Sequence, residues 1–277
     1  MINAIKNRLG LDATIIKIIA IILMVFDHIH QMWVPAGAPI WLKWLGRPVF
    51  PMFMFVMAES FHYTRSRKKF LWRLLLAAWF MVILNAVLME VLPNPNPNVV
   101  LMNGAFMTFF VAGLYMLFWD MLVDGIKTRK AGKSIGSVLL FLVPVLTAIP
   151  TLLIAGLAGK IPFGLLRVLL LVGMMIPSIF YAEAGPIMVL LGLLFYILRE
   201  RRWAQVAALA AVTALELALE LAMGGRVSIQ WIMIFAAIPL LLYNGEKGRG
   251  MKYFFYIFYP AHIYILYIIA TLWQRAR

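Results

Sequence analysis

Residues Met24 to Trp33 read "MVFDHIHQMW" and place two ionisable groups, Asp27 and His28, in a stretch that is otherwise mostly apolar. A histidine can take a proton from an amine or alcohol near neutral pH, and a nearby carboxylate can fix its tautomer. Neighbouring helix positions point ~100° apart, so each group needs a partner on another helix or a polar cavity. We take His28 as a candidate base, oriented by Asp27 or by a carboxylate of another span; a purely structural histidine is the alternative. His30 is expected at the membrane interface, where solvent contact explains it.

A second cluster of ionisable groups lies in "GRPVFPMFMFVMAESFHYTRSRKK", residues 46–69. Glu59 and His62 are three positions apart, share a helix face and are expected to pair. Arg47 opens the segment and is either a site residue or an interfacial cation whose charge snorkels to water. The cations that could receive phosphates at the inner membrane surface are Arg65, Arg67 and Lys68. An ordinary basic loop also explains these cations, but it does not explain Glu59 inside the membrane.

A third cluster occurs in "YIFYPAHIYIL", residues 256–266, where Tyr259 and His262 share a helix face. Pro260 is expected to interrupt the helix beside them, because proline has no backbone N–H to donate. His262 is expected near mid-depth of the last span. Ionisable groups at that depth are costly, so it is a candidate for contact with a reacting group, with a buried structural histidine as the alternative.

A polar stripe on one helical face of residues 203–223 could line a proton path or pack against other helices, and we favour packing. Its members are Gln205, Thr213, Glu216 and Glu220.

Soluble-enzyme signatures are absent from the sequence. It contains no cysteine, no phosphate-cradling glycine loop and no serine elbow. Four histidines spread over three expected spans do not suggest a metal site, so none is expected.

The elements that position these residues are expected to be membrane helices. Hydrophobic residues make up 64% of the chain and charged residues 13%, against roughly 45–50% and ~25% in soluble domains. The mean hydropathy is +0.93. Apolar residues form long blocks, such as Phe141 to Gly159, and blocks of ~18 or more indicate membrane spans. The sequence therefore predicts an all-α polytopic membrane protein with a single membrane-embedded domain, residues 1–277.

The net charge of +14 comes from short basic clusters between apolar blocks, the pattern of cytoplasmic loops. It does not come from a soluble basic module, so nucleic acid is not an expected partner. The basic start of the chain predicts a cytoplasmic N-terminus. The expected full spans outside the middle region cover about 11–33, 45–63, 69–92, 100–123, 185–198, 203–223, 228–243 and 253–273.

The middle region, residues 134–182, holds two apolar blocks, but charge placement requires an odd number of crossings there. We expect one block to be broken or re-entrant because it contains several prolines. About nine crossings plus this partial element result, ten helical segments in all, and residues 134–182 are expected to be a variable insertion.

These stretches together resemble the TraX family of bacterial membrane proteins, acetyltransferases known for acetylating the N-terminus of conjugative pilin. The resemblance rests on "IIKIIAIILMVFDHIH", "GRPVFPMFMFVMAESFHYTRSRKKFLWRLL", "LMNGAFMTFF", "YNGEKG" and "FYIFYPAHIYIL". By position it implies a set of functional residues: Asp27, His28, Arg47, Glu59, His62, Arg65, Asn103, Tyr259 and His262.

The resemblance implies that an acetyl group passes from cytoplasmic acetyl-CoA to an amine or hydroxyl of a peptide, glycan or small amine, in the bacterial cytoplasmic membrane. Direct transfer and a route through an acetyl-histidine both remain open. A proton-coupled transporter using Asp27, His28, Glu216 and Glu220, and a structural assembly factor without catalysis, are the alternative functions.

Overall fold

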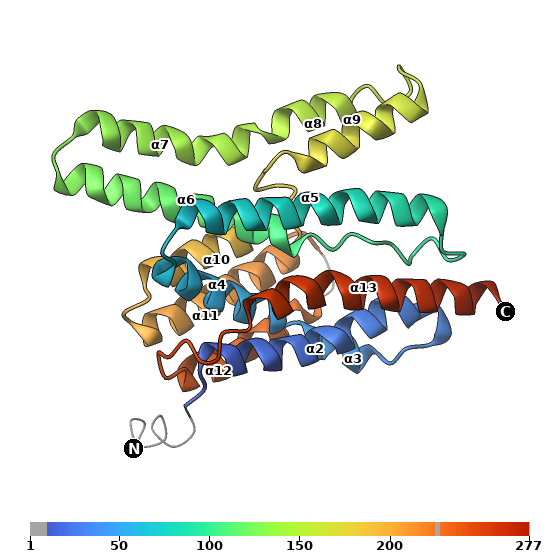
Figure 1. The fold of residues 1–277 in the computed structure, drawn as a ribbon, viewed down its shortest axis with the longest axis horizontal. Coiled ribbons are helices and arrows are strands. Elements are labelled where there is room, and N and C mark those ends of the chain that lie inside the picture. The colour runs from blue at the N-terminus through green and yellow to red at the C-terminus, as the bar shows by residue number, and fades with distance from the viewer. Residues whose placement is uncertain (1–9, 225–227, 277) are drawn as a thin grey trace. The chain divides into compact units, whose positions relative to one another are not determined.

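The computed structural model describes residues 10–224 and 228–276, and in these ranges the chain is helical without a strand (Figure 1). One isolated bridge joins Leu11 to Tyr243. The helices, in chain order, are α2 (Ala13–Trp33), η1 (Val34–Ala36), α3 (Ile40–Gly46), α4 (Val49–Tyr63), α5 (Arg67–Val91), α6 (Ala105–Lys127), α7 (Ala131–Leu146), α8 (Ala148–Ala155), α9 (Phe163–Met175), α10 (Gly185–Ile197), α11 (Arg202–Ala222), η2 (Ile229–Ala236), α12 (Ala237–Leu242) and α13 (Lys252–Arg275).

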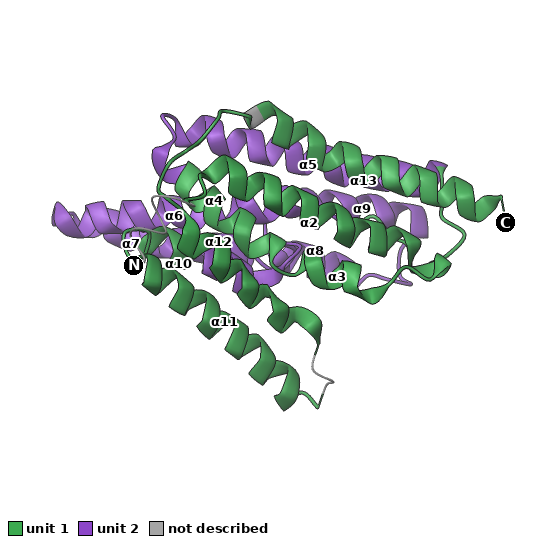
Figure 2. Cartoon of the chain, turned by 90° about the horizontal axis from the view of Figure 1, so that it is seen from below, with its two compact units in different colours: residues 1–60, 92–101, 194–277 green, residues 61–91, 102–193 purple. Residues whose placement is uncertain are grey.

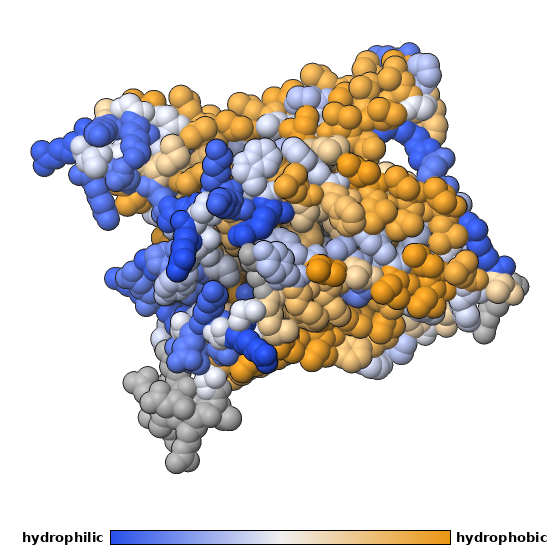
Figure 3. Space-filling model, viewed as in Figure 1, coloured by the Kyte–Doolittle hydropathy of each residue, from blue (hydrophilic) through white to orange (hydrophobic). Residues whose placement is uncertain are grey.

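Within the described ranges, six helical segments are long and apolar enough to cross a membrane. They are Ala13–Ala36, Arg67–Val91, Ala105–Lys127, Ala131–Ala155, Arg202–Ala222 and Tyr253–Arg275. Figure 3 shows apolar side chains over the middle of the helices and hydrophilic ones near their ends. The expected all-α polytopic class is confirmed. Other expected spans correspond to shorter apolar helices, such as α10 and the η2–α12 segment.

The chain divides into two compact units, coloured separately in Figure 2. Unit 1 comprises residues 1–60, 92–101 and 194–277, and unit 2 comprises residues 61–91 and 102–193. Unit 1 contains α2, α3, most of α4, α11, η2, α12 and α13. Unit 2 contains α5 to α9 and most of α10.

In unit 1, helix α2 begins at a defined cap and is clasped by a loop that is distant in sequence. Asp12 accepts a hydrogen bond from the Ile15 backbone N–H at 2.8 Å, which caps the helix. The Thr14 hydroxyl donates to the Arg249 carbonyl at 2.7 Å. Gly248 has φ +68° and lies against the Asp12 side chain, where a Cβ would overlap the carboxylate. The loop between α12 and α13 therefore holds the start of α2 in place.

Helix α2 packs against α13 and α3 within unit 1, and it buries a stripe of small and large apolar residues. Ile16 and Ala20 are fully buried one turn apart, and Met24 continues the same face. At ~1.5 Å per residue, 21 residues span about 31 Å, close to the ~30 Å hydrocarbon core. This stripe carries His28, a further turn along, onto the face that meets α13.

Unit 2 contains the expected broken element of residues 134–182. Helices α7 and α8 meet at Thr147, whose hydroxyl donates to the Pro177 carbonyl at 2.7 Å. The Ile179 N–H donates to the Pro144 carbonyl at 2.9 Å. Helix α9 has 13 residues, about 20 Å at ~1.5 Å per residue, so it is shorter than the bilayer core.

Candidate functional site

The two histidines expected to be functional meet inside unit 1. His28 Nδ1 on α2 lies 2.7 Å from His262 Nε2 on α13, and the rings stack with centroids 4.9 Å apart. Both residues are buried, with 6% and 8% of their surface exposed. The pair joins two helices whose sequence positions are 234 residues apart. It is a polar contact in an apolar surrounding, where a hydrogen-bonded pair is strengthened and an unpaired group is costly.

A second hydrogen bond determines which histidine of the pair donates and which accepts. His262 Nδ1 lies 2.7 Å from the Phe258 carbonyl oxygen. A carbonyl only accepts, so His262 Nδ1 carries the proton and, in the neutral ring, its Nε2 is an acceptor. His28 Nδ1–H therefore donates to His262, and the lone pair of the neutral His28 ring is on Nε2. The Phe258 ring stacks on His262 with centroids 4.9 Å apart, which holds the second ring in place.

Tyr259 lies beside His262, as their spacing predicts. It is 9% exposed, and its ring centroid is 6.1 Å from that of His262. The expectation that Pro260 interrupts this helix is wrong: α13 runs unbroken from Lys252 to Arg275 with Pro260 inside it. Proline is tolerated inside membrane helices, although Pro260 itself has no N–H to donate to the preceding turn.

Asp27 forms an ion pair with Arg47, the residue that follows α3, and not with the histidine next to it. Its carboxylate oxygens lie 3.0 and 3.3 Å from Arg47 Nη2. Arg47 Nη1 also donates to the Gln230 side-chain oxygen at 3.2 Å. The side chains of Asp27 and Arg47 are 25% and 23% exposed, so this trio of Asp27, Arg47 and Gln230 is accessible. His28 Nδ1 is hydrogen-bonded to His262. The expectation that a carboxylate orients the base is therefore wrong.

The approach of α2 to α3 at this point requires a glycine. Gly46 is buried, and a Cβ on it would overlap the Asp27 carboxylate. The sequence "LGRP" thus supplies the close approach and the cation in consecutive residues, Gly46 and Arg47.

Glu59 faces a cation that the sequence reasoning missed. Its Oε1 lies 3.9 Å from an Arg202 guanidinium nitrogen. The Arg202 guanidinium carbon is 4.8 Å from the ring centroids of both Phe55 and Tyr243. A planar guanidinium stacks well on aromatic faces, and this favours arginine over lysine here.

Gln205 completes the surroundings of Arg202. It accepts from Arg202 Nη1 at 2.6 Å and donates to the Phe195 carbonyl at 2.6 Å. In the sequence Arg202 ends "RERR" and looks like part of a basic loop. Only its position at the start of an apolar helix could have distinguished it from its neighbours.

The other expected site residues lie in unit 2. Arg67 forms an ion pair with Asp120 at 2.6 Å and lies 5.2 Å from the Phe61 ring centroid. Arg65, on the connection between α4 and α5, and Lys68, in the first turn of α5, are exposed. Arg67 is therefore held by the fold, while the two exposed cations have greater freedom.

His62 and Asn103 are the remaining expected site residues of unit 2. The His62 ring packs edge-on against Tyr63, with centroids 4.8 Å apart. Asn103 is buried just before α6, and the adjacent Gly104 N–H donates to Glu183 at 2.7 Å. The structure thus places Asn103 shortly before the start of α6.

The polar stripe of α11 makes local bonds. The Thr213 hydroxyl donates to the Leu209 carbonyl at 2.8 Å. Glu220 accepts from the Ser228 backbone N–H at 3.0 Å and from its hydroxyl at 2.5 Å. These bonds favour the packing interpretation for Thr213 and Glu220.

No group of three or more potential metal ligands occurs among residues 10–224 and 228–276.

Comparison with protein families matches residues 12–270 to the family described as TraX protein. The chain belongs to the TraX family. The match begins at the cap of α2 and extends almost to the end of α13, so it includes both histidines of the buried pair. The comparisons of this TraX-family protein with curated proteins and with solved structures gave no match.

Proposed function

We propose that this TraX-family protein is a membrane acetyltransferase that moves an acetyl group from acetyl-CoA to an amine or hydroxyl. The observation that carries the proposal is the buried pair of His28 and His262, joined at 2.7 Å across α2 and α13. Ionisable groups at membrane depth are expensive, and their presence there is typical of a functional site. Family membership supports the same reaction, since the TraX resemblance implies acetyl transfer.

In the proposed reaction, His28 Nε2 takes the proton from the acceptor amine or hydroxyl. The acceptor's lone pair attacks the thioester carbonyl, the carbon–sulfur bond breaks, and the proton passes from His28 to the departing thiolate. His262 accepts the His28 Nδ1–H bond throughout, so it stabilises the imidazolium and orients its ring. A route through an acetyl-histidine would use the same nitrogen as the nucleophile.

Stabilisation of the oxyanion is a second requirement of acyl transfer. Tyr259 is the candidate donor, because its side chain is buried next to His262. The phenol can donate a hydrogen bond that strengthens as negative charge develops on the carbonyl oxygen.

The phosphates of the donor are proposed to bind at the cations that begin α5. Arg65 and Lys68 are exposed there, and Arg67 is held beside them by Asp120. Positive charge between membrane helices favours a cytoplasmic location for this connection. We accordingly propose a cytoplasmic N-terminus and location in the bacterial cytoplasmic membrane, where acetyl-CoA is supplied from the cytoplasm.

The experiment uses the full-length protein purified in detergent and radiolabelled acetyl-CoA. Fractions of membrane lipids, envelope glycans and exported peptides are offered as acceptors, and label in each is measured. His28→Ala is expected to lower transfer by about 10²–10⁴, the usual contribution of a positioned base. His30→Ala, on the same helix but outside the pair, is the matched control and should retain activity.

Two results would end the proposal. One is wild-type protein that transfers label to no fraction. The other is His28→Ala protein that matches wild type in activity. Size-exclusion profiles and thermal midpoints of each variant show whether the fold is retained, so a loss of activity is not confused with unfolding.

A further inference from the structure

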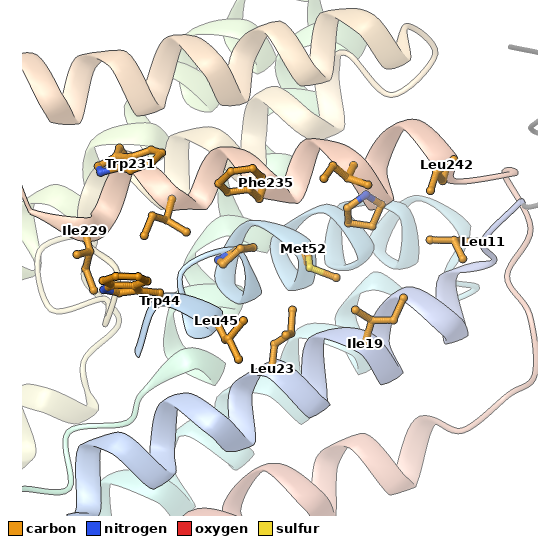
Figure 4. Close-up of a pocket in the computed structure, with 14 residues that line it drawn as sticks. Leu11, Ile19, Leu23, Trp44, Leu45, Met52, Ile229, Trp231, Phe235 and Leu242 are labelled. Atoms are coloured by element: carbon orange, nitrogen blue, oxygen red, sulfur yellow. The ribbon is translucent and has the colours of Figure 1, made fainter. Parts of the chain in front are cut away.

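Unit 1 contains an apolar groove, whose lining residues are drawn in Figure 4. Several of these residues are sequence neighbours of Arg47 or Gln230. The groove has a volume of about 810 Å³, and all of its lining residues are apolar or tryptophan. One wall is α2, with Ile19 and Leu23, and the opposite wall is η2 and α12, with Phe235 and Ile238. Phe235 and Ile238 are about half exposed, so the groove is open at the surface of the unit.

The polar trio lies next to lining residues of this groove, although none of its three members is itself a lining residue. Ile19, Leu23 and Asp27 are spaced four residues apart on α2, so the apolar stripe leads directly to the carboxylate. Arg47 lies in sequence between the lining residues Leu45 and Pro48.

Gln230 repeats this arrangement on the opposite wall, because it lies between the lining residues Ile229 and Trp231. The three polar side chains bond to one another, so they lie together beside the apolar space. Asp27 belongs to α2, Arg47 to the connection between α3 and α4, and Gln230 to η2.

The lining distinguishes between possible occupants of the groove. It presents almost no hydrogen-bonding group, so the polar backbone of an extended peptide would lose water there without gaining a partner. A hydrocarbon chain has no polar group to satisfy, and its burial in such surroundings is favourable. The groove therefore fits the chain of a lipid.

The trio provides the binding groups for a polar head. Arg47 has five N–H donors and uses Nε, Nη1 and Nη2 toward Lys43, Gln230 and Asp27. Its partial exposure leaves it within reach of a further acceptor. Asp27 can accept a hydrogen bond from a hydroxyl or an amine, and it is the residue before His28.

We propose that the groove and the trio together bind a membrane amphiphile that is the acetyl acceptor. Its hydrocarbon chain lies in the groove, and its hydroxyl- or amine-bearing head lies at Asp27, Arg47 and Gln230. This inference rests on the proposed acetyltransferase function. In the reaction the head loses one proton to His28, forms the new bond to the acetyl carbon, and coenzyme A leaves as the thiol.

The test uses a single-chain phospholipid with an ethanolamine head and a photoreactive group in its chain, added to the full-length protein in detergent. Mass spectrometry locates the labelled peptides, and acetylation of the ethanolamine is measured with acetyl-CoA. Label is expected in residues 19–23 and 229–242, above that in the exposed apolar face of α5, which reports ordinary lipid contact.

Leu23→Trp fills the groove from α2, and Ile238→Trp fills it from α12. Each is expected to lower groove labelling and lipid acetylation about tenfold. A lipid chain that can no longer bury about two of its CH₂ groups in the groove binds about tenfold more weakly. Ile22→Trp is the matched control: it places the same side chain at the neighbouring, exposed position of α2, outside the groove.

Label spread equally over α5 and the groove, and unchanged by both filling variants, would overturn the proposal. So would selective labelling without acetylation of any lipid while His28-dependent transfer to peptides or glycans persists; the proposed function would then stand. Absence of transfer to every acceptor would instead remove the proposed function and the acceptor role with it, and groove labelling would still report whether the lipid binds.

Discussion

The Asp27 carboxylate occupies the space in which a side chain on Gly46 would lie, and it is held there by Arg47 at 3.0 Å. This relationship sets the distance between α2 and α3. It also directs Asp27 away from His28 Nδ1, which is bonded to His262 instead. Asp27 and His28 therefore belong to two different polar assemblies, although they are neighbours on the same helix.

Gly46→Ala is expected to destabilise the protein by about 1–3 kcal/mol, because the added methyl group overpacks a buried contact. Thermal unfolding in detergent, followed by tryptophan fluorescence, measures the effect. Gly136→Ala is the matched control, since a Cβ there meets nothing within 4 Å. In a helix this control change is neutral or stabilising by up to ~1 kcal/mol. Equal midpoints for the two variants would show that the close approach at Gly46 does not matter.

The tautomers of the histidine pair give a second prediction. His262 Nδ1–H donates to the Phe258 carbonyl and His28 Nδ1–H donates to His262, so both neutral rings should be protonated at Nδ1. Nitrogen-15 NMR of histidine-labelled protein distinguishes the two ring nitrogens, and the chain has only 4 histidines to assign. Single His→Gln variants provide the assignments. A spectrum in which His28 is protonated at Nε2 would contradict the proposed direction of proton transfer.

Arg202 gives a third prediction. It lies between the Phe55 and Tyr243 rings and faces the buried Glu59. Arg202→Ala is expected to destabilise the protein by on the order of 3 kcal/mol, because it leaves a buried carboxylate without its cation. The double variant Arg202→Ala with Glu59→Gln should recover part of this loss, as a double-mutant cycle would measure.

The control for Arg202 is the preceding arginine, Arg201, which is exposed. Arg201→Ala should change stability by less than ~0.5 kcal/mol. Additive effects of the Arg202 and Glu59 changes would mean that these two side chains do not interact in the folded protein.

The sequence was sufficient to identify the membrane class and both members of the histidine pair. The cost of placing ionisable groups in apolar helices makes residues such as His28 and His262 conspicuous. Their pairing could not be predicted, because it depends on how α2 and α13 pack, and these helices are separated by most of the chain. Helical periodicity indicates a face but does not name the helix that the face meets.

The cations show what could not be predicted from the sequence. Arg202 and Arg67 both lie in basic runs that positive-inside charge placement explains by itself. The structure distinguishes them from their neighbours by their partners, Glu59 and Asp120. Nothing in the sequence indicated a role for Gln230. A neutral amide in an apolar segment can be assigned a role only when its hydrogen-bond partner, here Arg47, is known.

The cations at the start of α5 give the last prediction, which separates donor binding from folding. Arg67 is paired with Asp120, and both side chains are about one-third exposed. Arg67→Ala should therefore lower stability by about 0.2–1 kcal/mol. Arg65 and Lys68 are exposed, and the double variant Arg65→Ala with Lys68→Ala should leave the thermal midpoint unchanged.

The same double variant should raise the KM for acetyl-CoA about three- to tenfold with little change in kcat, because exposed cations contribute screened, ground-state attraction to phosphates. Added salt should raise the wild-type KM in the same direction and have less effect on the variant. Lys160→Ala removes an exposed cation from the connection between α8 and α9 and is the control. If the double variant and Lys160→Ala give the same KM as wild type, the donor phosphates bind elsewhere. An unchanged KM would leave the histidine pair as the site of chemistry, since the transfer step depends on His28 and not on how the donor's phosphates are held.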